Sequence, residues 1–204
     1  AGAEMDRKHA NGDKHLHLAC RCGHAEVASR LLDAGAEVDR ANFYGATPLH
    51  IACANGHAKV ASRLLDAGAE VDRADTDGYT PLHIACRKGH LELASRLLDA
   101  GAEVDHAGTD GDTSLFGACA NGHTEVVSRL LDAGAEVDHA DTNGNTPLHL
   151  SCQNGHAEVA SRLLDAGAEV DRADADGRTP LLFACSHGHL EVALRLLNAG
   201  AEVD

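Results

Sequence analysis

A Gly-His pair recurs along the chain at a constant spacing of 33 residues, and this period constrains the fold more than any other feature. A fixed period of this length indicates structural units that stack on one another, because each unit is too small to bury its own apolar face. The pair begins at residues 23, 56, 89, 122, 155 and 188. The sequence therefore predicts an array of repeats.

The Asp that closes each unit sets the phase of the repeats and divides the chain into six. The ranges are 7–39, 40–72, 73–105, 106–138, 139–171 and 172–204, called repeats 1 to 6. Residues 1–6 read AGAEMD, close to the AGAEVD that ends repeats such as 34–39, so we expect them to be the end of a preceding partial repeat. The chain ends in the same phase without a polar capping unit. We expect one solenoid domain cut from a longer array.

Repeat 3 shows how one unit is expected to fold. Thr80 can cap a helix with its hydroxyl group, and Pro81 suits the first helical position, where no amide hydrogen is required. Gly89 supplies a left-handed turn, after which a second helix rich in leucine ends before Gly101. Polar residues 102–111 predict a loop or short hairpin. Such short helices are marginal alone, so stacking must stabilise them.

Several motifs recur within this period: Thr-Pro-Leu-His at 47–50, 80–83 and 146–149, then Ala-Cys, Gly-His, Leu-Leu and Ala-Gly-Ala. Together they resemble the ankyrin repeat family over essentially the whole chain. Lys14 and His15 replace Thr and Pro in repeat 1, so we expect its first helix to be poorly capped and to fray. The resemblance implies an all-α solenoid of helix-turn-helix units with protruding hairpin loops. It also implies a concave face, lined by hairpins and first helices, that holds a protein partner, without identifying that partner.

The charge of the chain argues against several classes of partner. There are 17 Lys and Arg against 32 Asp and Glu, a formal net charge of −15. Such a surface repels phosphate backbones and anionic lipid headgroups. The sequence contains no apolar run of the roughly 20 residues that cross a bilayer and no charged-then-apolar leader. We therefore expect neither nucleic acid nor a membrane as a partner.

The cysteines follow the repeat period. Equivalent positions in stacked repeats lie roughly 10 Å apart, the distance between packed helices, whereas a disulfide needs Cα atoms within about 7 Å. We therefore expect reduced, buried thiols and an intracellular, reducing compartment, most simply the cytoplasm. The six periodic cysteines are Cys20, Cys53, Cys86, Cys119, Cys152 and Cys185.

Histidine is abundant, and ten of the 15 histidines fall in two columns that recur once per repeat, so we interpret them as structural. The densest group of potential metal ligands is His15, His17, Cys20, Cys22 and His24, but three of the five are column residues and no paired Cys-x-x-Cys motif is present. We expect no metal site and no cofactor. A phosphate-binding loop and a nucleophile elbow are also missing from the sequence, so we expect no enzyme activity.

Positions that differ between repeats identify the candidate binding surface, at hairpin tips and first-helix ends. Aromatic residues and arginine are favoured in binding hot spots, although tip aromatics can also simply pack on neighbouring hairpins. The candidates for binding a partner are Arg21, Phe43, Tyr44, Tyr79, Arg87, Lys88, Asp110, Asp112, Asn121, Asn143, Asn145, Gln153 and Asn154.

Net charge is concentrated in repeats 4 and 5, which carry −5 and −4. A partner that spans them is expected to present basic residues. The leading hypothesis is a non-catalytic module that binds a partner protein or peptide on the concave face. The alternatives are a structural spacer within a longer ankyrin array and a regulatory array attached to a catalytic domain outside this chain. We expect a monomer, with end-to-end stacking as the alternative.

Overall fold

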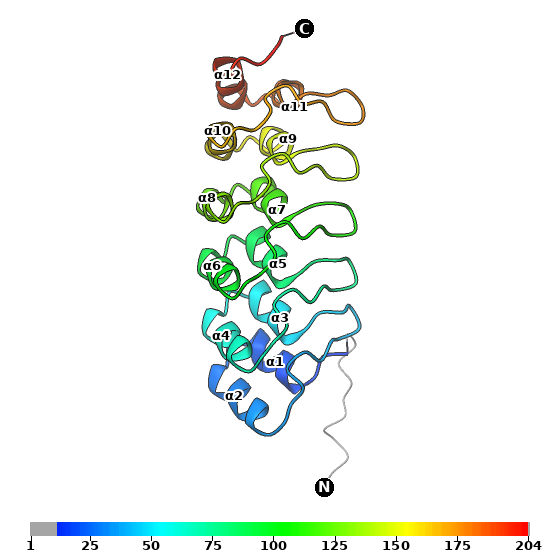
Figure 1. The fold of residues 1–204 in the computed structure, drawn as a ribbon, viewed down its shortest axis with the longest axis vertical. Coiled ribbons are helices and arrows are strands. Elements are labelled where there is room, and N and C mark those ends of the chain that lie inside the picture. Colours follow the sequence, from blue (N-terminus) through cyan, green and yellow to red (C-terminus); the bar gives the residue numbers. More distant parts are fainter. Residues whose placement is uncertain (1–11, 204) are drawn as a thin grey trace.

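The computed structural model describes residues 12–203, which form one stack of twelve helices with no strand in that range (Figure 1). Each 33-residue unit contributes a seven-residue first helix and a nine-residue second helix. The helices are α1 (His15–Arg21), α2 (Ala25–Asp33), α3 (Pro48–Ala54), α4 (Ala58–Asp66), α5 (Pro81–Arg87), α6 (Leu91–Asp99), α7 (Ser114–Ala120), α8 (Thr124–Asp132), α9 (Pro147–Gln153), α10 (Ala157–Asp165), α11 (Pro180–Ser186) and α12 (Leu190–Asn198).

The helices form two layers, and the hairpins project from one side of the stack (Figure 1). The odd-numbered first helices pack against one another beside the hairpins, and the even-numbered second helices form the outer layer. Their leucines occupy the interior: Leu49, Leu82 and Leu148 on first helices and Leu97 on a second helix are fully buried. The expected all-α solenoid is confirmed.

The first helices begin as their Thr and His residues predict. In repeat 2, the Thr47 amide donates to His50 Nδ1 at 3.1 Å, and the Thr47 hydroxyl lies 2.8 Å from the same nitrogen. Because Nδ1 accepts the amide proton, His50 is neutral and carries its proton on Nε2. Nε2 then donates to the Tyr79 carbonyl of the next repeat at 3.0 Å. The histidine thus caps its own helix and fixes the following hairpin.

The same contacts recur at His17 and His149 of this column. His17 Nε2 reaches the Ala46 carbonyl at 3.2 Å, and His149 Nε2 reaches the Arg178 carbonyl at 3.1 Å. Burial lowers the pKa of each of these histidines, and it lowers the pKa of His83 to about 4. Protonation would place a second proton on Nδ1, where the backbone amide already donates. The structural interpretation of this column is confirmed.

The Gly-His pair joins each repeat to the one before it. Gly89 ends α5 with φ of +74°, and the His123 ring of repeat 4 packs directly over it. His123 Nε2 bonds to the Arg87 carbonyl at 3.1 Å, so the same histidine also satisfies a free carbonyl at the helix end. Glycine is required both for the left-handed backbone and for the close approach of the ring.

The first repeat forms its helix without a threonine cap. The Lys14 amide donates to His17 Nδ1 at 3.2 Å, and α1 has the same seven residues' length as the other first helices. On the outer layer, Glu92 and Arg96 of α6 form an ion pair at 3.0 Å. Arg129 of α8 instead reaches back to Asp99 of the preceding repeat, at 2.8 Å.

Candidate functional site

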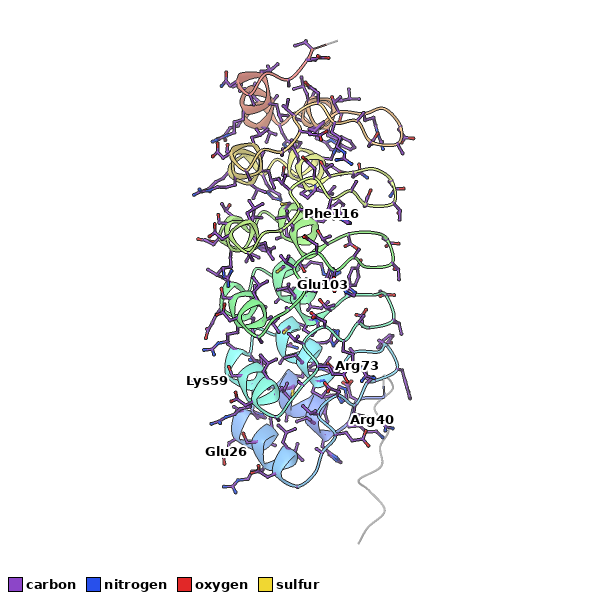
Figure 2. The ribbon with its side chains drawn as sticks, viewed as in Figure 1. Glu26, Arg40, Lys59, Arg73, Glu103 and Phe116 are labelled. Carbon is purple, nitrogen blue, oxygen red and sulfur yellow. The ribbon has the colours of Figure 1, made fainter. Side chains whose placement is uncertain are left out.

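The hairpins and the C-terminal ends of the first helices form one continuous surface, the hairpin face. Figure 2 shows Phe116 of α7 on this side and Glu26 and Lys59 on the opposite, second-helix side. The hairpins of repeats 2, 3, 5 and 6 are held by an Asp or Asn whose side chain accepts two backbone amides: Asp75 Oδ1 accepts from Asp77 and Tyr79, both at 3.0 Å. These residues are structural, and they leave the tip side chains free to project.

Neighbouring hairpins are also bonded to each other. The Thr76 amide donates to the Tyr44 carbonyl at 3.0 Å, and the Thr142 amide donates to the Asp110 carbonyl at 2.9 Å. One such bond joins each pair of successive tips from repeat 2 to repeat 6. The tips therefore form a ladder in which each side chain has a fixed distance from its equivalents.

Phe43 and Tyr44 are the most exposed aromatic side chains on this surface, at 70% and 63%. The Phe43 ring lies over Gly12 of the preceding hairpin, close enough that a Cβ at Gly12 would stand 2.7 Å from the ring. One side of Phe43 therefore packs on its neighbour while the rest of the ring faces solvent. Both proposed roles, packing and contact with a partner, are compatible with this position.

Tyr79 differs from these two residues because it is half-buried. Its ring packs 5.5 Å from the His83 ring, and the Arg87 guanidinium lies 5.1 Å from the tyrosine ring centroid. Burial raises the pKa of the Tyr79 phenol, and the negative charge of the nearby Asp112 carboxylate raises it further. Tyr79, Arg87 and Asp112 thus form one packed group that joins repeats 3 and 4.

The two flanking cations have different surroundings. Arg21, the last residue of α1, is paired with the buried carboxylate of Asp13. Lys88 follows the end of α5 as an exposed C-cap residue. Both side chains are exposed, but within residues 12–203 only Arg21 of the two forms an ion pair.

Most of the amide side chains proposed for binding are used within the fold. Asn121 Nδ2 donates to the Gly117 carbonyl at 2.9 Å, and Asn154 Nδ2 donates to Leu150 and Ala120 carbonyls at 3.0 and 3.1 Å. Asn145 Nδ2 lies 3.2 Å from Asp141 Oδ2. Among the described residues, the Gln153 side chain is not used in this way: Gln153 is half-buried and its backbone carbonyl accepts from His189. Asn143 is exposed at its tip.

The acidic candidates also divide into two kinds. Asp110 is exposed at the tip of the repeat 4 hairpin. Asp112 is half-buried against Tyr79, and burial raises the pKa of its carboxyl group. Asp110 is thus the free acidic group of this hairpin.

Repeat 4 contains a departure that the sequence comparison did not assign to the surface. Gly108 stands where repeats 3, 5 and 6 have Asp75, Asp141 and Asp174, and Asp112 Oδ1 lies over the vacant position. Gly117 replaces a branched or aromatic residue and lines a small cavity with Tyr79, His83, Arg87, Asp112 and Thr113. A comparison of equivalent positions in the repeats could have found this small cavity, because both glycines differ from the residues at the equivalent positions.

Residues 12–203 contain no group of three or more potential metal ligands placed to hold an ion. Over the same residues, no helix combines the length and apolar character needed to cross a membrane. All seven cysteines, which lie within this part of the chain, are free thiols, and only Cys22 and Cys185 are exposed.

The chain matches a model of the ankyrin repeat family, described as ankyrin repeats in three copies, over residues 1–75, 64–141 and 118–204. Among solved structures it is similar to the human ASB11 ankyrin repeat domain, with 30% identity and a TM-score of 0.87. That match covers 94% of this chain and 86% of the other. No curated protein sequence matches. With a family match across its whole length and the same stacked fold, the chain belongs to the ankyrin repeat family.

Proposed function

We propose that the chain is a non-catalytic module that binds a partner protein or peptide on its hairpin face. Ankyrin repeats are in general protein–protein interaction modules, which supports the class of function. The observation that carries the proposed face is the pair Phe43 and Tyr44, which expose most of their rings at adjacent tip positions. Solvent-exposed aromatics on a rigid ladder lose little conformational freedom on binding.

The charges of the hairpin face support a direction for the partner. Exposed cations, Arg87 and Lys88, lie in repeat 3, whereas Asp110 and the exposed tip residue Asn143 lie in repeats 4 and 5. A partner with basic residues facing repeats 4 and 5 matches this distribution. The side chains we propose for contact are therefore Phe43, Tyr44, Lys88, Asp110 and Asn143, with the packed Tyr79–Arg87–Asp112 group as a rigid support.

A pair of alanine substitutions tests the proposal. Phe43→Ala with Tyr44→Ala removes the exposed rings while leaving the backbone bond from Thr76 to the residue 44 carbonyl in place. Leu91→Ala is a matched control, because Leu91 is an exposed apolar residue on the second-helix side. We expect affinity capture from the source organism to lose partners with the double variant and to keep them with the control.

The alternatives make different predictions for the same experiment. A structural spacer would capture the same proteins with and without Phe43 and Tyr44. A regulatory array would capture no partner from the extract. It would instead bind the catalytic domain of the parent protein when that domain is supplied separately. Capture that also survives Asp110→Asn and high salt would remove the electrostatic part of the proposal.

A further inference from the structure

One histidine of the column that caps the first helices, His83, lacks the contact that its equivalents make with the following hairpin. His50 and His149 each donate from Nε2 to a backbone carbonyl of the next repeat, at 3.0 and 3.1 Å. His83 is only 4% exposed, and its Nδ1 accepts from the Thr80 amide at 3.1 Å, so its proton is on Nε2. Within the described part of the chain, no acceptor meets this proton in hydrogen-bond geometry, the equivalent carbonyl of Asp112 included. His83 therefore presents a buried, unpaired donor.

A buried acceptor lies at the same place. Asp112 Oδ1 has no hydrogen-bond partner among the residues that the structure describes. Asp112 and His83 both line the small cavity of repeat 4, together with Tyr79, Arg87, Thr113 and Gly117. Unpaired polar atoms in a buried position cost free energy. A donor and an acceptor beside one cavity indicate that it receives a polar group.

The cavity exists because Gly117 carries no side chain. The equivalent residues of repeats 2, 3, 5 and 6 are Ile51, Ile84, Leu150 and Phe183. In repeat 6, the Phe183 ring fills the equivalent space and lies 5.6 Å from the His149 ring, edge to face. In repeat 4 the space stays open to the hairpin face, since Arg87 is exposed and Tyr79 and Gly117 are half-buried.

The chemistry of the cavity selects the group that can enter it. A carboxylate would oppose the Asp112 carboxylate, and an ammonium group would oppose both the His83 N–H and the Arg87 guanidinium. A carbonyl would accept from His83 and leave Asp112 without a donor. A hydroxyl group accepts one hydrogen bond and donates another, so it satisfies both residues. The cavity volume of about 10 Å³ has room for about one such group and not for a carboxamide.

We propose that this cavity is a hydroxyl-binding subsite of the hairpin face, which receives a serine or threonine side chain of the partner. The inference rests on the proposed function, because the partner supplies the group. Two of the lining residues, Arg87 and Asp112, stand close in sequence to the proposed contact residues Lys88 and Asp110. Water offers the same donor and acceptor, and the experiment distinguishes it from a side-chain hydroxyl group.

The test uses random peptides displayed on phage and selected on the immobilised 204-residue chain. We expect the peptides whose binding requires Phe43 and Tyr44 to share a serine or threonine. Replacing that threonine of a synthetic peptide by valine keeps the shape of the side chain and removes the hydroxyl group. This replacement should weaken binding roughly tenfold, as for the loss of a hydrogen bond to a charged acceptor.

Two variants of the chain separate the subsite from folding. Gly117→Ala narrows the cavity, and its Cβ would lie at an ordinary contact distance of 3.5 Å from the Arg87 Cβ. His83→Phe removes the donor, and Phe116 shows that this column accepts phenylalanine. On either variant the threonine and valine peptides should bind equally, whereas on the control Leu91→Ala the tenfold difference should remain. Circular dichroism checks that each variant is folded.

The outcomes distinguish the subsite from the proposed function. Peptides that require Phe43 and Tyr44 but show no preference for a hydroxyl group would overturn the subsite, leave the proposed face intact and assign the cavity to water. A tenfold difference that persists on Gly117→Ala and on His83→Phe would place the hydroxyl group elsewhere and also overturn the subsite. If no selected peptide requires Phe43 and Tyr44, the proposed function fails and the inference fails with it.

Discussion

The contact between Gly89 and His123 allows the energy of repeat stacking to be measured against a control in the same repeat. Gly89 and Gly101 both end helices of repeat 3, with φ of +74° and +90°. A Cβ at Gly89 would lie 2.6 Å from His123 Nδ1, whereas a Cβ at Gly101 would have no atom within 4 Å. Alanine at either position strains the backbone, but only Gly89→Ala also pushes on the next repeat.

The expected magnitudes follow from these two terms. Placing alanine in the left-handed region costs roughly 1–2 kcal/mol, and overpacking a fitted contact costs roughly a further 1–3 kcal/mol. We expect Gly101→Ala to lower the free energy of unfolding by about 1–2 kcal/mol and Gly89→Ala to lower it by about 2–5 kcal/mol. The strain at Gly101 is not smaller, since its φ lies further from the range that alanine tolerates.

Urea unfolding followed by circular dichroism measures both variants. Repeating Gly89→Ala in a His123→Ala background removes the ring, and the cost of the alanine should then fall to about 1–2 kcal/mol. Equal destabilisation by Gly89→Ala and Gly101→Ala, or an unchanged cost after His123→Ala, would refute the role given to the Gly-His pair.

Three further predictions concern the inner contacts of the fold. Because burial lowers the pKa of His83 to about 4 from the usual 6.5, the unfolded state binds more protons than the folded state between these values. Stability is therefore full above pH 6.5 and is lost as pH falls, by about 2 kcal/mol for His83 between pH 7.5 and pH 5. Urea titrations at the two pH values should show a smaller loss for His83→Phe, and an equal loss would contradict the assignment. Thr146→Ala removes the hydroxyl group 2.9 Å from His149 Nδ1 and should reduce the free energy of unfolding by about 1 kcal/mol, whereas no change would show that the cap is unimportant. A thiol reagent should modify Cys22 and Cys185 rapidly in dilute folded protein and the other five cysteines only after unfolding, because burial raises the pKa of thiols such as Cys20 and Cys86 to about 12. Rapid reaction at Cys86 would contradict its buried position.

Much of the fold could be predicted because residues at the start and end of each helix mark the helix boundaries in the sequence. Thr80 and Pro81 begin α5, and Gly89 and Gly101 follow α5 and α6, as their chemistry requires. The spacing of the cysteines placed them in one buried column, with Cys185 as the exception because no described repeat covers it.

The candidate site was harder to predict because the use of a polar side chain depends on its neighbours in space. Asn121 and Asn154 stand at positions that differ between the repeats, which is why they were candidates for binding. In the structure their side-chain amides donate to backbone carbonyls. Tyr44 precedes the hairpin glycine whereas Tyr79 follows it, and the packing of Arg87 and His83 against Tyr79 makes that ring half-buried. The exposed Leu182 and Leu194 of repeat 6 were detectable in principle, since they stand where most other repeats have His and Ser.

A site-specific photo-crosslink tests the central claim, that the hairpin face binds a partner protein, most directly. A benzophenone amino acid replaces Phe43 on the hairpin face in one variant and Leu91 on the second-helix side in another, both exposed positions. After illumination in an extract of the source organism, the account predicts a discrete crosslinked protein from position 43 and none from position 91. Crosslinking from position 91 alone, or from neither position, would contradict the account.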